Sequence, residues 1–290
     1  MATRWQSPDS AGDAPGLGAL VLRQRGPALA ILALSVAGWA FLAWLTVDMS
    51  HPVAQLTMPD SWRWSLTSMV AIWLMWAVMM AAMMLPSALP MILTFMDLSS
   101  QRRAAPSDLH PLGGPAAGRA GGLSGRTGEP ARGRSFVAAY LVVWFAFSVA
   151  ATAAQWVLQV AGWVDPMLVS TSIVLTALLL VVGGLYQFSP LKRVCLSHCR
   201  TPMGFLIGEW RPGVKGGFTM GLRHGFLCVG CCWALMALLF VGGVMNLAWI
   251  AALSVAVAVE KLAPGGERLA AMLGLTLIAA GVVKLLSFVQ

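Results

Sequence analysis

Seven long runs of apolar residues, nearly free of charged side chains, divide this sequence. A helix needs roughly 20 such residues to cross a bilayer core about 30 Å thick. Most of the runs reach that length, and the sixth is the shortest. The runs cover residues 27–47, 66–93, 136–161, 167–188, 221–242, 245–259 and 269–288.

The composition excludes a soluble globular domain. The chain is 58% hydrophobic and only 10% charged, with a mean hydropathy of +0.77. An ordinary soluble domain carries about 25% charged residues and could not hide this much apolar surface from water. The sequence therefore predicts an all-α fold, a polytopic transmembrane helix bundle of about seven helices.

The Lys and Arg residues predict the orientation of this bundle. With the amino terminus in the cytoplasm, only Arg63 and Lys284 of the 19 Lys and Arg residues fall on the outer side. Such a bias follows the positive-inside rule and, with seven crossings, places the carboxyl terminus outside. The net charge of +8 is then explained by topology and by contact with anionic lipid headgroups. There is no basic folded domain that would indicate nucleic-acid binding.

The runs also predict the domain organisation. Residues 1–26 are expected to form a disordered cytoplasmic tail, and residues 27–96 the first two helices, the first of them an uncleaved anchor. Residues 97–135 are rich in Gly, Pro, Ala and Arg and predict a disordered cytoplasmic loop. Residues 136–290 supply the remaining helices of the same membrane domain.

The five cysteines are clustered, and none lies in a predicted outer loop, which argues against a periplasmic disulfide framework. Cys228, Cys231 and Cys232 lie in the fifth predicted helix. At 100° per residue, His224, Cys228 and Cys231 fall within an arc of about 60°, with Cys232 beside them. Thiolate and imidazole together suit Cu(I), with Zn(II) as the alternative. The other interpretation is that these cysteines are small apolar residues in a helix contact.

The second predicted helix is rich in methionine. Met79 and Met83 are four residues apart and share a face, as do Met80 and Met84. Thioethers are soft, uncharged ligands that can bind Cu(I) inside a membrane, although methionine is also ordinary packing material. Counted from the cytoplasmic ends, these methionines and the cysteines of the fifth helix have a similar depth.

A second group of possible ligands lies in a predicted cytoplasmic connection. Cys195, His198 and Cys199 would share one face of a helix through i, i+3 and i+4 spacing. Nearby cationic side chains would lower the pKa of these thiols and favour metal uptake at the membrane surface. The alternative is a surface helix with incidental cysteines.

Two charged residues, Glu260 and Lys261, end the sixth predicted helix. Lys261 is expected to snorkel toward the cytoplasmic face. Glu260 is interpreted as an end charge, a proton carrier or a residue that orients a ligand. Because they are adjacent in sequence, the two side chains need not pair with each other.

Four segments of the sequence resemble the bacterial family of predicted metal-binding integral membrane proteins. This family is a domain of unknown function with a Met-rich helix and a Cys-x-Gly-Cys-Cys-Trp helix. The resemblance covers most of the chain from the second helix onward and implies metal binding in the bacterial inner membrane. It leaves the metal, its direction of movement and its purpose open. The matching segments are 73–87, 186–202, 221–236 and 260–261.

The sequence thus favours a multi-pass inner-membrane protein that handles Cu(I) for transport or delivery, and not an enzyme. Expected partners are the lipid bilayer, a cytoplasmic metal donor and a membrane or periplasmic copper enzyme. The alternatives are a thiol-disulfide oxidoreductase that uses Cys228 and Cys231, a haem protein and a purely structural subunit. A haem protein is disfavoured because His224 is the only histidine in a predicted span.

Overall fold

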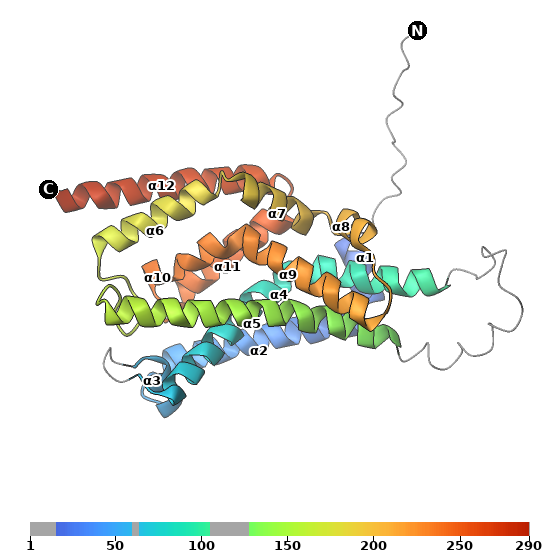
Figure 1. Cartoon of the computed structure of the whole chain (residues 1–290), viewed down its shortest axis with the longest axis horizontal. Coiled ribbons are helices and arrows are strands. Elements are labelled where there is room, and N and C mark those ends of the chain that lie inside the picture. The colour runs from blue at the N-terminus through green and yellow to red at the C-terminus, as the bar shows by residue number, and fades with distance from the viewer. Residues whose placement is uncertain (1–15, 60–63, 105–127, 290) are drawn as a thin grey trace, which may run out of the picture.

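The computed structural model describes residues 16–59, 64–104 and 128–289 of the chain. Within these ranges the fold is built from α-helices, with isolated β-bridges and no strand, which confirms the all-α class (Figure 1). The helices are α1 (Leu17–Arg23), α2 (Arg25–Val47), α3 (Pro52–Thr57), α4 (Leu66–Ala104), α5 (Gly128–Val160), α6 (Ile173–Tyr186), α7 (Pro190–Arg200), α8 (Pro202–Glu209), α9 (Gly213–Ala237), α10 (Leu239–Gly242), α11 (Leu247–Leu262) and α12 (Gly266–Val289).

In the described part of the chain, five helical segments are long and apolar enough to cross a membrane. They are α2, α4, α5, α9 with α10, and α12. A sixth span is possible if α6 and α7, which meet at a bend of 63°, are counted as one broken span. Each of the seven apolar runs contains a helix, but α11 has only 16 residues. The count of about seven crossings and the orientation of the bundle therefore stay predictions.

The helices reach further than the apolar runs. In the predicted amino-terminal tail, α1 and the start of α2 are helical. In the predicted loop, α4 continues to Ala104 and α5 already begins at Gly128. This moves the boundaries of both segments, because hydropathy detects the apolar part of a helix while Ser, Gln and Arg continue it. The remainder of the two segments, residues 1–15 and 105–127, lies outside the described residues.

Glycines set the close approach of α9 to α5, which run side by side in Figure 1. A Cβ atom at Gly221 would overlap the backbone of Phe136, and one at Gly225 would come within 2.9 Å of the Val143 side chain. A Cβ at Gly217 would lie 2.9 Å from the carbonyl oxygen of Arg132. This is the small-residue contact that lets membrane helices pack with their backbones close together.

The long helix α4 contains Pro86 and Pro90, and its neighbour α2 supplies a hydrogen bond that the first of these prolines removes. Proline has no N–H, so Pro86 leaves the carbonyl of Ala82 without its usual helical donor. The buried Ser35 hydroxyl of α2 donates to that carbonyl oxygen at 2.7 Å. Gly38 of α2 also faces Ala82, where a Cβ would lie 2.8 Å from the Ala82 methyl group. The proline break is therefore stabilised within the bundle.

We expect Gly221→Ala to lower the thermal midpoint of the detergent-solubilised protein. The added methyl group forces α9 away from α5, at a cost of about 1–3 kcal/mol. Gly208→Ala on α8 is the control, because a Cβ there meets no atom within 4 Å and alanine favours the helix. Tryptophan fluorescence during heating measures both. Equal midpoints for the two variants would contradict this account of the α5–α9 contact.

Candidate metal centre

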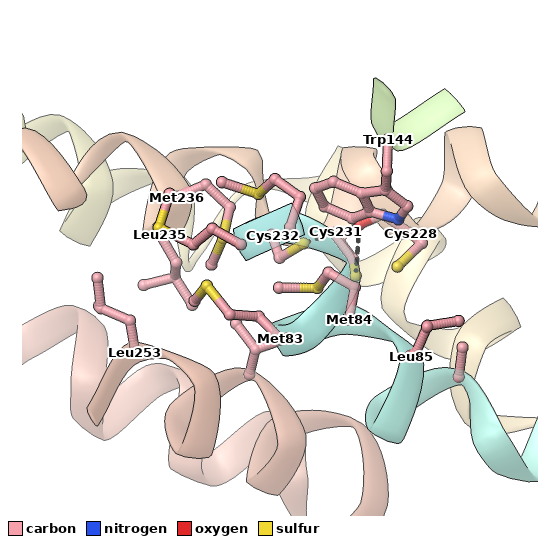
Figure 2. Packing of buried hydrophobic residues seen from close by; sticks show 14 of the residues in the cluster. Met83, Met84, Leu85, Trp144, Cys228, Cys231, Cys232, Leu235, Met236 and Leu253 are labelled. Atoms are coloured by element: carbon pink, nitrogen blue, oxygen red, sulfur yellow. Dashed lines mark hydrogen bonds between the residues drawn. The ribbon is translucent and has the colours of Figure 1, made fainter. Parts of the chain in front are cut away.

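Three cysteines of α9 are buried in the middle of the bundle (Figure 2). The Sγ atoms of Cys231 and Cys232 both donate to the carbonyl oxygen of Cys228, at 3.1 and 3.0 Å. These two thiols therefore interact with their own helix. The thiol of Cys228 instead reaches other helices.

The Cys228 thiol lies where four helices meet. The Lys261 Nζ of α11 donates to the Cys228 Sγ at 3.0 Å and to the Ser87 hydroxyl of α4 at 3.2 Å. The Tyr140 hydroxyl of α5 lies 3.1 Å from the same sulfur and 3.3 Å from the Met84 carbonyl oxygen. The Cys228 thiol of α9 thus contacts α11 and α5 directly. It is linked to α4 indirectly, because Lys261 and Tyr140 both also bond to that helix.

His224 lies one helical turn before Cys228, among aromatic rings. Its imidazole stacks on Tyr140 with ring centroids 5.5 Å apart, and on Phe136 at 6.0 Å. The side chain is buried, and its Nδ1 has no hydrogen-bond partner among the described residues. Buried polar atoms are normally paired, so an unpartnered imidazole nitrogen beside a thiol cluster fits a soft or borderline metal ion.

The predicted cytoplasmic cysteines also reach α9. After the 63° bend, α7 packs along α9, and the Tyr186 hydroxyl just before the bend donates to the Gly230 carbonyl oxygen. The Cys195 Sγ lies against Gly230, where a Cβ would be only 2.8 Å away. The Cys199 side chain also interacts with that of Cys231. Two separate sequence clusters therefore form one group of thiols.

His198 does not join this group. Its side chain is exposed, and its Nδ1 lies 2.8 Å from the Val194 carbonyl oxygen of the same helix. In the structure His198 therefore lies apart from Cys195 and Cys199, and its role as a ligand stays a prediction. The buried face of α7 is centred on Lys192, Cys195 and Leu196, and a residue three positions after Cys195 falls at its edge.

The cationic residues of α7 attach it to the end of α11. Lys192 forms a buried ion pair with Glu260 at 2.6 Å, with side-chain exposures of 1% and 3%. Arg200 donates to the carbonyl oxygens of Glu260 and Ala263, the latter at 2.7 Å. In the structure Glu260 is thus the partner of Lys192, which fixes α7 over the cysteines of α9.

Lys261 was expected to snorkel to the membrane surface, and this was wrong. The residue is only 6% exposed, and its ammonium group points at Cys228. Sequence reasoning also missed Tyr140 and Ser87. The signal for Lys261 was present, since an ionisable residue in an apolar helix marks a functional site by default. No comparable sequence signal distinguished Tyr140 or Ser87.

The four methionines of α4 named as possible ligands are all buried in the hydrophobic core. Figure 2 shows Met83 and Met84 in the part of the core that holds Cys231 and Cys232. Tyr140 of α5 contacts both the Met84 carbonyl oxygen and the Cys228 thiol, so it bridges α4 and α9 here. Met79 and Met80 lie one turn away along α4.

The side chains of this cluster do not stand in the arrangement of a finished metal site. In the described part of the chain, no three His, Cys, Asp or Glu side chains are placed to hold one metal ion together. The thiols of Cys231 and Cys232 are turned to a backbone carbonyl instead. The ligand role of the eleven residues named from the sequence stays a prediction.

Comparison with protein families identifies the chain. The PpoB2 family, described as a copper chaperone, matches residues 73–284, well over half of the sequence. The chain belongs to this copper chaperone family. The match includes every residue of the thiol cluster described above and supports a copper-related domain, as the resemblance to metal-binding proteins implied. It does not favour a thiol-disulfide oxidoreductase. No curated protein and no solved structure shows significant similarity.

Substitution of Lys192 and Glu260 tests whether their ion pair keeps α7 in place in this member of the copper chaperone family. We expect Lys192→Met alone to destabilise the protein by about 3–5 kcal/mol, because it leaves a buried carboxylate without its counter-charge. The double variant Lys192→Met with Glu260→Met is expected to recover most of this loss. Thermal unfolding in detergent measures both. A double variant no more stable than Lys192→Met would show that the pair is not the main contact.

Proposed function

We propose that this protein is an integral membrane copper chaperone that binds Cu(I) among the thiols of α9 and α7 and delivers it to an acceptor. Copper is the cargo in this proposal, and no catalysis is involved. The observation that carries it is the convergence of the buried Cys228, Cys231 and Cys232 with the partly exposed Cys199 in a member of a copper chaperone family.

The membrane setting is supported by two independent features. Five helical segments among the residues that the structure describes have the length and hydropathy of membrane spans. The strong bias of Lys and Arg toward one side is typical of bacterial inner-membrane proteins with a cytoplasmic amino terminus. A chaperone in this position would receive copper on the cytoplasmic side from a metal donor. It would deliver copper to a membrane or periplasmic copper enzyme.

The chemistry of the cluster suits Cu(I) better than other abundant metals. Thiolate and thioether are soft ligands, and the imidazole of His224, one helical turn before Cys228, is a further possible ligand. Cys231 and Cys232 can turn from the Cys228 carbonyl oxygen toward a metal by rotation about χ1, without moving α9. The thioethers of Met83 and Met84 are uncharged and could assist from α4. Zinc is the alternative cargo.

The position of α7 supports a route for the ion. Cys199 is partly exposed, whereas its partner Cys231 is buried. A Cu(I) ion bound first at Cys199 would therefore be passed to the α9 thiols by exchange of one sulfur ligand for the next.

The proposal is tested by copper content. We expect the protein purified without oxygen to bind about one Cu(I) per chain, and the Cys228→Ser, Cys231→Ser, Cys232→Ser triple variant to lose it, because a hydroxyl is a poor ligand for Cu(I). Mass spectrometry of the metal and competition with a Cu(I) chelator measure binding. Ser148→Ala is the control, since this buried hydroxyl bonds only to the Trp144 carbonyl within α5. Retention of copper by the triple variant would refute the proposal.

The route through α7 makes a kinetic prediction. We expect Cys199→Ser to slow the loading of Cu(I) by about tenfold or more, because it removes the thiol that contacts Cys231. Cys195→Ser on the same helix is the matched comparison and should have the smaller effect, since Cys195 packs on Gly230. Stopped-flow transfer from a coloured Cu(I) complex gives both rates. Equal rates for the two variants would contradict this route.

A further inference from the structure

A cavity of about 400 Å³ lies where α7 turns away from α12. The helix α6 packs along α12 (Figure 1), whereas after the 63° bend α7 packs along α9 instead. The bend therefore leaves a space between the first turns of α7 and the start of α12. Residues of both helices line this space, and its volume is typical of sites that bind small molecules.

Gln187, which directly follows α6, lines the cavity with an amide group that lacks a partner. The residue is 4% exposed, and neither its Oε1 nor its Nε2 has a hydrogen-bond partner among the described residues. The Glu260 carboxylate lies near this amide but is bonded to Lys192. A Cβ at Gly274 of α12 would lie 2.8 Å from the Gln187 Cβ, so the side chain is held at a tight helix crossing. Because buried amides are normally paired, the position indicates a ligand that supplies the missing partner.

The charge at this cavity is positive. Arg193 of α7 and Arg268 of α12 both line it, and in the described part of the chain neither forms an ion pair with a carboxylate. Lys192 lines it as well, but its charge is balanced by Glu260. The only acidic residue of the described lining is Glu267, so two guanidinium groups stand against one carboxylate. The cavity therefore favours an anion.

The rest of the lining is apolar, and it separates a lipid from a soluble anion. Phe188, Leu196, Ala270 and Ala271 form this part of the wall. The helix α12 has the length and hydropathy of a membrane span, and its first turns lie at the cavity. A free phosphate ion would leave this apolar surface uncovered. The glycerol and upper acyl chains of a phospholipid would cover it.

We propose that this cavity binds the headgroup of an anionic phospholipid. The phosphate group lies between Arg193 and Arg268, since guanidinium groups match the geometry of phosphate oxygens, and it accepts a hydrogen bond from the Gln187 Nε2. A headgroup hydroxyl donates to the Gln187 Oε1. Basic pockets between membrane helices on the cytoplasmic side are known to bind lipid headgroups in this way. The inference uses the membrane setting of the chain but no property of the copper site.

A lipid in this place has a structural consequence. Its headgroup would contact α7 through Arg193 and α12 through Arg268, two helices that the bend has separated. Because α7 also carries Cys199, the lipid would help to keep that thiol beside α9. We therefore expect added anionic lipid to raise the thermal midpoint of the protein in detergent.

The first test compares phosphatidylglycerol with zwitterionic phosphatidylcholine, each added to the delipidated protein in detergent. Native mass spectrometry of the lipid-bound chain gives the two affinities. We expect phosphatidylglycerol to bind about tenfold more tightly, and the double variant Arg193→Gln with Arg268→Gln to lose this preference, because it removes both guanidinium partners of the phosphate. Both side chains are exposed, so their replacement leaves the fold intact. Arg25→Gln with Lys215→Gln is the matched control, since it removes the same charge from exposed residues that do not line the cavity.

A second variant, Gln187→Met, tests the buried amide. Methionine has a similar size and shape but cannot donate to a phosphate oxygen. We expect it to weaken the binding of phosphatidylglycerol by about threefold or more, while the thermal midpoint of the lipid-free protein stays the same or rises, because an unpaired amide leaves the interior. A purely structural Gln187 would give the reverse result, a lower midpoint with unchanged lipid affinity.

Soluble glycerol phosphate distinguishes the two sources of a phosphate group. If it displaces phosphatidylglycerol at an equal concentration, the cavity is a site for a soluble anion and the lipid inference is overturned. Equal affinity of the wild type for the two lipids, or an equal loss of preference in both double variants, overturns it as well. A preference that only the Arg193 and Arg268 variant loses, and that glycerol phosphate does not affect, supports it. Copper takes no part in these measurements, so their result is independent of the proposed function.

Discussion

The contact between the Lys261 ammonium group and the Cys228 thiol is the interaction on which the centre of this protein depends. It joins α11 to α9. Lys261 also contacts Ser87 of α4, and Cys228 also contacts Tyr140 of α5. A buried lysine in an apolar bundle cannot exchange these partners for water. The positions of four helices are therefore linked to the place where the thiols gather.

Glu260 and Lys261 are neighbours in sequence but belong to different parts of this arrangement. About 100° apart on α11, they point to different helices. Glu260 holds Lys192 of α7, and Lys261 holds Cys228 of α9. One turn of α11 thus fixes both the helix that carries Cys199 and the helix that carries the other thiols. Any movement of α11 would change how these two groups of cysteines meet.

Much of the fold could be predicted from the sequence, because hydropathy identified the helices and helical periodicity placed His224 beside the α9 cysteines. The sequence could not show the 63° bend that turns α7 onto α9, so it placed Cys195 and Cys199 at a separate surface site. Nor could it show where the Lys261 side chain points, because a lysine at this position of a helix can either extend to the membrane surface or stay buried. These features depend on contacts between distant segments, which cannot be deduced from the periodicity of a single helix.

The thiols of Cys231 and Cys232 each donate a hydrogen bond to the Cys228 carbonyl oxygen of their own helix. Such a bond contributes only about 1 kcal/mol, far less than a Cu(I)–thiolate bond releases. The α-helix itself keeps its own hydrogen bonds when the side chains rotate. In the function proposed above, the cluster would therefore change from a packed apolar layer to a set of ligands, and back, without unfolding of α9. A chaperone needs such reversibility, because a site that required rebuilding the bundle would release its cargo too slowly to deliver it.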